Sequence, residues 1–129
     1  MNHDSIYLII DDNSIDRKIA SMLMEKCMDN PKVFQVEDSN SGIDWIIKNR
    51  ASFSEKLVIL LDMQMPNIDG FGFLEDYEQL DEAFKNRNEI IMLSSMDNES
   101  FFTQKAVNNP LVKSVLNKPL DVDELRKVT

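Results

Sequence analysis

Five polar side chains that could bind a metal ion or a phosphate follow apolar runs of the chain. The acids Asp11 and Asp12 end one such run, and Asp62, Ser94 and Lys118 follow three others. Adjacent carboxylates at the end of a buried run repel each other and resist desolvation, so a cation is needed to offset their charge. Three carboxylates with no histidine or thiolate beside them form an all-oxygen site, which suits Mg²⁺ better than Zn²⁺ or copper.

The same side chains suit phosphoryl transfer. An aspartate such as Asp62 can act as the nucleophile and form an aspartyl phosphate. A cation held against it would neutralise the transferring group, while Lys118 would contact that group as a point charge and the Ser94 hydroxyl would donate a hydrogen bond to it. Each residue alone is also explained as a turn acid, a helix cap or a solvated lysine, and only their position at matching strand ends favours a site.

Apolar runs bounded by turn residues predict five strands, several of them buried on both faces because they are rich in Ile and Val without clean alternation. The predicted strands are residues 6–10, 33–36, 57–61, 89–93 and 111–116. Because helical segments separate them, the chain is predicted to be an α/β protein, a doubly wound five-stranded parallel sheet with helices on both faces. Ligand-binding groups in such sheets gather at the carboxyl ends of the strands.

Four of the intervening helices are predicted from apolar residues at helical spacing, and the last from a capping acid, Asp121, with Glu124 three positions on. The apolar stripes are, in chain order, Ile15, Ile19, Met22 and Leu23; Ile43, Ile46 and Ile47; Phe73, Leu74, Tyr77 and Leu80; Phe101, Phe102 and Ala106 within residues 98–109; and Val122, Leu125 and Val128.

Composition narrows the functional class. The 129 residues suit one domain, residues 1–129, and the formal charge of −9 disfavours direct nucleic-acid binding. Three glycines without a phosphate-binding fingerprint exclude dinucleotide and Walker-type sites. No apolar run is long enough to span a membrane, and the single cysteine, Cys27, is expected to be a core thiol of a cytoplasmic protein.

Four motifs in order resemble those of the receiver domain of two-component response regulators: IIDDNS, LLDMQMPNIDGFGFLE, IIMLSS and VLNKPL. Their spacings cover essentially the whole chain, and the pattern D-x-x-x-P-x-x-x-G begins at Asp62. The resemblance implies a flavodoxin-like fold of five β–α units with strand order 2-1-3-4-5.

The resemblance also implies a metal site. Asp62 is similar to the family's phosphoacceptor, Asp12 to the acid that binds Mg²⁺ directly, and Asp11 to the acid that acts through a bound water. Gln64 would offer its backbone carbonyl to the ion. Ser94 takes the place of the hydroxyl residue that moves toward the phosphoryl group.

Lys118 corresponds to the invariant lysine of the family, and the Lys118–Pro119 bond to its cis peptide. The chain departs from the family at Val115, where receivers commonly carry Tyr or Phe. A branched aliphatic side chain cannot swing a large ring between exposed and buried states. We therefore expect an activation signal to travel mainly through the loop after Ser94 and the fourth helix.

The implied function is a phosphorylation switch that catalyses only its own phosphorylation and dephosphorylation. A histidine kinase or histidine phosphotransfer protein would supply the phosphoryl group, and the modified domain would bind an unknown output protein through an altered surface. Two alternatives remain. One is a phosphatase similar to the haloacid dehalogenases, although Gln64 stands where they carry a second aspartate and the chain lacks their cap domain. The other is a receiver-like scaffold that is not phosphorylated.

Overall fold

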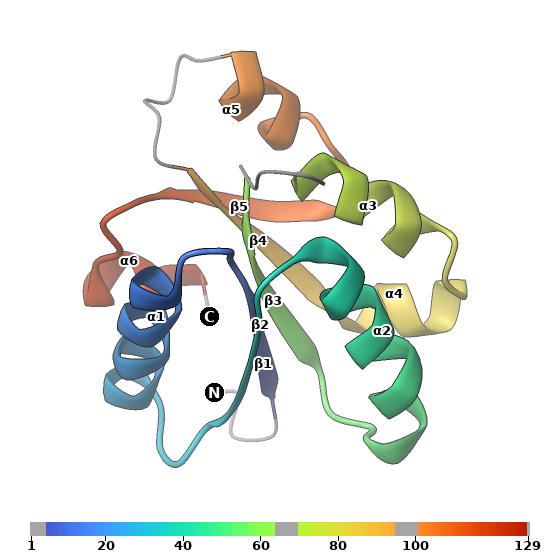
Figure 1. The fold of residues 1–129 in the computed structure, drawn as a ribbon, viewed down its shortest axis with the longest axis horizontal. Helices are drawn as coiled ribbons and strands as arrows, with labels where there is room; N and C mark the ends of the chain where they lie inside the picture. Colours follow the sequence, from blue (N-terminus) through green and yellow to red (C-terminus); the bar gives the residue numbers. More distant parts are fainter. Residues whose placement is uncertain (1–4, 64–69, 95–100, 129) are drawn as a thin grey trace.

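The sheet is parallel, as the sequence predicts, with strand order β2-β1-β3-β4-β5 (Figure 1). The computed structural model of the protein describes residues 5–63, 70–94 and 101–128. Within them the strands are β1 (Ile6–Ile10), β2 (Lys32–Val36), β3 (Leu57–Asp62), β4 (Glu89–Ser94) and β5 (Val112–Asn117). Each predicted strand is present, with its bounds shifted by one residue at most.

Helices cover both faces of the sheet. In the described residues they are α1 (Ser14–Cys27), α2 (Ser39–Asn49), the 3-10 helix η1 (Arg50–Ser52), α3 (Gly70–Glu78), α4 (Glu82–Arg87), α5 (Phe101–Val107) and α6 (Val122–Val128). α1 and α6 lie on one side of the sheet, and α2, α3 and α4 lie on the other (Figure 1). None of these helices is long and apolar enough to cross a lipid bilayer.

The core has two parts, one on each face, because successive side chains of a strand point to opposite faces. Leu8, Ile10 and Ile59 pack with residues of α2, α3 and α4, whereas Ile9 and Leu60 pack with residues of α1 and α6. Every residue of β1 and β3 is buried. The edge strand β2 has only exposed and half-buried positions, since it has only one neighbouring strand.

The apolar stripe predicted for α1 is wrong at three of its four positions. Ile15, Ile19 and Met22 are exposed, whereas Ala20 and Met24 are fully buried. Apolar residues occupy a wider arc of this helix than one face, and the sheet covers the side that carries Ala20 and Met24. Leu23, the fourth predicted residue, is half-buried against the core, as is Cys27.

The stripes of α2 and α3 fit the structure better. Ile46 is buried and Ile43 half-buried, but Ile47 is exposed. Phe73, Leu74 and Tyr77 are buried, and Leu80 packs against the core just beyond the end of α3. In α6 the predicted Leu125 is buried, with Val128 packed beside it.

The helix α4 was not predicted. The sequence features that mark this helix are a capping acid, Asp81, and one apolar residue, Phe84. The Asp81 side chain accepts a hydrogen bond from the Phe84 amide at 3.0 Å, and Phe84 is buried. The predicted segment 98–109 corresponds to α5, which ends at Val107. Ala106 is buried there as predicted. Residues 98–100 and the Phe101 and Phe102 side chains lie outside the described part.

Two methionines of α1 test which face of this helix carries its packing energy. We expect Met24→Ala to lower the free energy of unfolding by about 2–5 kcal/mol, because the side chain is fully buried. The matched variant Met22→Ala should change it by less than about 0.5 kcal/mol, since Met22 is 51% exposed. Urea unfolding followed by circular dichroism measures both values, and equal losses would contradict the packing described above.

Candidate functional site

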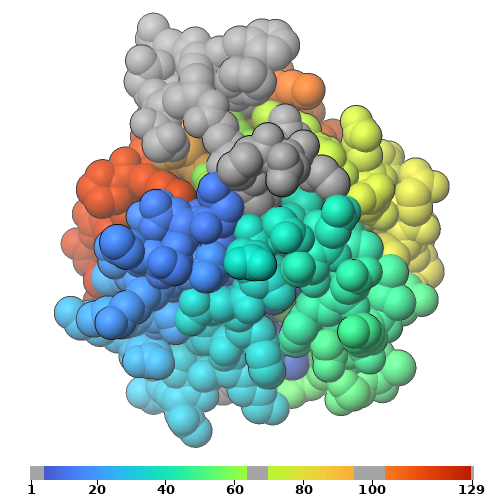
Figure 2. All heavy atoms as spheres, in the orientation of Figure 1, coloured from blue at the N-terminus to red at the C-terminus, as the bar shows by residue number. Residues whose placement is uncertain are grey.

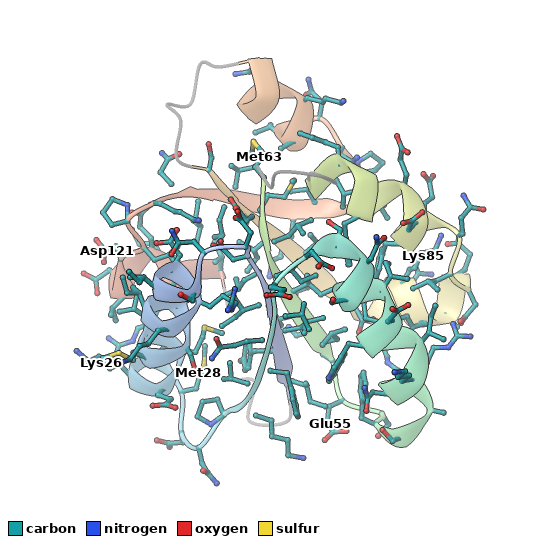
Figure 3. All side chains as sticks on the ribbon, in the orientation of Figure 1. Lys26, Met28, Glu55, Met63, Lys85 and Asp121 are labelled. Atoms are coloured by element: carbon teal, nitrogen blue, oxygen red, sulfur yellow. The ribbon has the colours of Figure 1, made fainter. Side chains whose placement is uncertain are left out.

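The carboxyl ends of the strands bring three acids together. In the parallel register Ile10 lies beside Leu61 and Asp62 beside Leu93, so the residues after Ile10 meet the end of β3. Asp11, Asp12 and Asp62 each offer a carboxylate oxygen, and these oxygens lie within 4.8 Å of one another. Figure 3 labels Met63, the buried residue that follows Asp62, and so marks this rim of the sheet.

The first two acids have different surroundings. Asp11 is buried, and its Oδ1 accepts a hydrogen bond from the Asn13 amide at 2.9 Å while its Oδ2 accepts one from Lys118 at 2.7 Å. Arg17 donates to the Asp11 backbone carbonyl at 2.7 Å. Asp12 is exposed at the rim. Asp11 is therefore held in place by the protein, whereas Asp12 faces solvent.

Lys118 is the cation of the rim. Its Nζ lies 2.7 Å from Asp11 Oδ2, 2.9 Å from Asp16 Oδ2 and 3.5 Å from Asp62 Oδ1. Burial alone would lower the pKa of Lys118, but the hydrogen bonds to Asp11 and Asp16 and the charge of Asp62 outweigh it, so the pKa lies well above its ordinary value. The ammonium therefore stays charged across the physiological pH range.

Backbone contacts bring Lys118 to the rim from the far edge of the sheet. The Lys118 amide donates a hydrogen bond to the Ser94 carbonyl at 2.7 Å, and the Lys118–Pro119 peptide is cis, as the resemblance implies. Ser94 is buried at the end of β4, one residue beyond Leu93, the register partner of Asp62. The structure thus brings Asp11, Asp12, Asp62, Ser94 and Lys118 to one rim, and Gln64 lies outside the described residues.

Sequence reasoning missed one participant, Asp16. The Asn13 side chain caps α1 by accepting hydrogen bonds from the Ile15 and Asp16 amides at 2.9 and 3.0 Å. This cap sets the start of α1 directly after the acid pair and places Asp16, in the first helical turn, within reach of Lys118. A possible signal was an acid four residues after Asp12, although the sequence also allowed it to be an ordinary first-turn acid.

The donor set fits a hard divalent cation. Three carboxylates converge within one coordination sphere and, among the described residues, neither histidine nor cysteine joins them. The Lys118 ammonium lies against the same acids, so a bound cation would share them with it. Asp12 and Asp62 would hold the ion, because Asp11 already accepts hydrogen bonds on both oxygens.

The surroundings of Gly70 explain why the motif that begins at Asp62 ends in a glycine. A Cβ built on Gly70 would lie 2.8 Å from the Asp62 backbone oxygen and 2.7 Å from Met92 Cε. The Gly70 amide also donates to the Met63 carbonyl at 3.2 Å. The start of α3 therefore packs directly on the backbone of the site, and only glycine leaves room for this contact.

This packing makes Gly70→Ala a test of the link between α3 and the rim. We expect the substitution to cost about 1–3 kcal/mol of unfolding free energy and to weaken Mg²⁺ binding, because Asp62 must shift. The matched variant Gly42→Ala crowds side chains rather than the site backbone, with Ile10 Cδ1 at 2.6 Å and Phe73 Cε1 at 3.3 Å, and should keep the Mg²⁺ affinity. Chemical unfolding and isothermal titration of Mg²⁺ measure the two effects. Unchanged Mg²⁺ affinity in Gly70→Ala would show that the rim does not depend on this contact.

Comparison with known proteins agrees with the fold and the motifs. A family model described as the response regulator receiver domain matches residues 7–129. No curated protein sequence matches the chain.

Solved structures of receivers are similar over nearly the whole chain. A response regulator receiver protein from Dyadobacter fermentans is 32% identical with a TM-score of 0.84, covering 95% of this chain and 93% of that one. A two-component response regulator from Cytophaga hutchinsonii is 22% identical with a TM-score of 0.85, covering 96% and 92%. The Mg²⁺-complexed receiver domain of the histidine kinase CKI1 from Arabidopsis thaliana is 21% identical with a TM-score of 0.76, covering 99% and 96%. The chain belongs to the response regulator receiver domain family of two-component systems.

Proposed function

We propose that this receiver domain is a phosphorylation switch that accepts a phosphoryl group on Asp62 in a Mg²⁺-dependent reaction. The observation that carries the proposal is the convergence of Asp11, Asp12 and Asp62 oxygens within 4.8 Å, with the Lys118 ammonium 3.5 Å from Asp62. A nucleophilic carboxylate, a hard-cation donor set and a fixed positive charge are the groups that phosphoryl transfer to an aspartate requires.

In the proposed reaction an oxygen of Asp62 attacks the phosphorus of the donor. The new O–P bond forms as the bond from phosphorus to the donor's histidine nitrogen breaks, and the nitrogen keeps the electron pair. Lys118 compensates negative charge on the phosphoryl oxygens, and the Ser94 hydroxyl donates a hydrogen bond to one of them. When bound, Mg²⁺ supplies charge neutralisation at those oxygens.

The two neighbouring acids take unequal roles in this proposal. Asp12 binds the ion directly, since it faces solvent, and Asp11 acts through a water, since its two oxygens already accept hydrogen bonds from Asn13 and Lys118. The backbone carbonyl of Gln64 completes the proposed ligand set. Residues 1–129 act as one such domain.

The proposed phosphodonor is a histidine kinase or a histidine phosphotransfer protein, and α1 offers a surface for it. Ile15, Ile19 and Met22 are exposed at spacings of four and three residues, so they form one apolar stripe along the helix, here called the α1 stripe. Figure 2 shows α1, in blue, at the surface of the molecule. The stripe begins three residues after Asp12, so a protein docked on it would bring its histidine near Asp62.

Acetyl phosphate tests the phosphoacceptor directly. With Mg²⁺, intact-mass measurement should find one phosphoryl group on the protein and on the control Asp76→Asn, an exposed acid of α3. Asp62→Asn should carry none, because an amide oxygen is a poor nucleophile, and EDTA should abolish the adduct. Repeated hydrolysis of phosphate esters would instead identify a phosphatase, and absence of any adduct a scaffold. Both outcomes contradict the proposed switch.

Substitutions in the α1 stripe test the docking surface. We expect the double variant Ile15→Ser and Met22→Ser to slow phosphotransfer from a purified, phosphorylated histidine phosphotransfer domain by roughly tenfold or more, since buried apolar anchors dominate such interfaces. Its labelling by acetyl phosphate should not change, because the small donor needs no protein contact. The control is Ile47→Ser, at an isoleucine of α2 that is 52% exposed. Equal transfer rates in all variants would place the docking surface elsewhere.

A further inference from the structure

The acid Asp16 competes with Asp62 for the Lys118 ammonium. Lys118 Nζ donates hydrogen bonds to Asp11 at 2.7 Å and to Asp16 at 2.9 Å, whereas its distance to Asp62 is 3.5 Å. Of the three acids around this lysine, the proposed phosphoacceptor is therefore the most distant. Asp16 is not among the residues that the receiver motifs assign to the site.

Asp16 is held in position for this contact. Its amide donates to the Asn13 side chain at 3.0 Å, which ties it to the capped start of α1, and the Asp11 carboxylate accepts from the Asn13 amide at 2.9 Å. The Lys118 side chain is 17% exposed and that of Asp16 is 37% exposed. The ion pair is thus partly shielded from water. A partly buried ion pair is stronger than one at a fully exposed surface.

An ammonium beside Asp62 and a divalent cation beside Asp62 exclude each other in part, since both neutralise the same carboxylate and their positive charges repel. If Asp16 lost its charge, Lys118 would be attracted only by Asp11 and Asp62 among the three acids that it contacts. The ammonium would then move toward Asp62. Removal of Asp16 should therefore weaken cation binding at Asp62 through the movement of the lysine.

We propose that Asp16 is a positioning residue for Lys118: its carboxylate draws the ammonium away from Asp62 and so keeps it from taking the place of the cation beside the phosphoacceptor. The inference rests on the proposed function, in which Asp12 and Asp62 hold Mg²⁺. It adds to that function a residue that acts on the metal site through the lysine.

A double-mutant cycle separates this action from a simple effect of charge. We expect Asp16→Asn to weaken Mg²⁺ binding, measured by isothermal titration, by about tenfold in the otherwise unchanged protein, a factor typical of charged groups in contact. In a Lys118→Met background the same substitution should weaken binding only about twofold, because only the screened long-range charge is lost. Equal factors in the two backgrounds would overturn the proposal.

Two further variants serve as controls for the double-mutant cycle. Asp16→Glu keeps the charge in the same helical turn and should restore most of the Mg²⁺ affinity. Glu25→Gln removes an exposed acid from the same helix, far from the lysine, and should leave the affinity unchanged. Thermal unfolding without Mg²⁺ checks that each variant folds. Failure of Asp16→Glu to restore binding, or an equal loss in Glu25→Gln, would contradict a positioning role.

A crystal structure of metal-free Asp16→Asn tests the inference without any metal. The distance from Lys118 Nζ to Asp62 Oδ1 should shorten from 3.5 Å to hydrogen-bond range. If the unaltered protein bound no Mg²⁺, the proposed function would be wrong. The distance between Lys118 Nζ and Asp62 Oδ1 in the Asp16→Asn variant would still show whether Asp16 positions the lysine. If Mg²⁺ bound normally and the lysine stayed in place, only the positioning role would fail.

Discussion

The rim of the sheet depends on the ion pairs between the Lys118 ammonium and the carboxylates around it. Asp11 is buried, and an unpaired buried carboxylate costs several kcal/mol, so the contact with Lys118 is what allows the acid to lie there. The two residues are 107 positions apart in the chain. Because the Lys118 amide also binds the Ser94 carbonyl, this one residue connects the ends of β1, β4 and β5.

The parallel sheet makes such a rim possible. β3 lies between β1 and β4, so Asp62 has polar strand ends on both sides. Helices packed on the two faces of the sheet shield the strands from solvent. The edge strand β2 contributes a backbone contact, since its Val36 carbonyl accepts a hydrogen bond from the Asp11 amide at 3.2 Å, and Asp38 after it caps α2 by accepting a hydrogen bond from the Ser41 amide at 2.7 Å. An acid that follows a strand therefore has a different role at each place in the sheet. Asp38, after the edge strand β2, caps the next helix, whereas Asp62, at the end of the central strand β3, faces the ends of the neighbouring strands.

Much of the sheet and of its rim could be predicted from the sequence. All five strands lie within one residue of their predicted bounds, and the rim residues Asp11, Asp12, Asp62, Ser94 and Lys118 were named from their place after apolar runs. The predictions were weakest for helices. Ile15 and Met22 were expected in the core and are exposed, and α4 was missed because six residues are too few for a periodic pattern.

The sequence by itself determined the strands, the capping residues and the set of side chains available for chemistry, because these depend on local propensity and on the order of apolar and polar residues along the chain. Only the tertiary structure decided which face of α1 is buried and which acid the lysine prefers. Both depend on contacts between residues far apart in sequence, such as Asp16 and Lys118, which are 102 positions apart. Local patterns carry no information on the distances that rank such contacts, and ion-pair strength depends on those distances and on the surrounding burial.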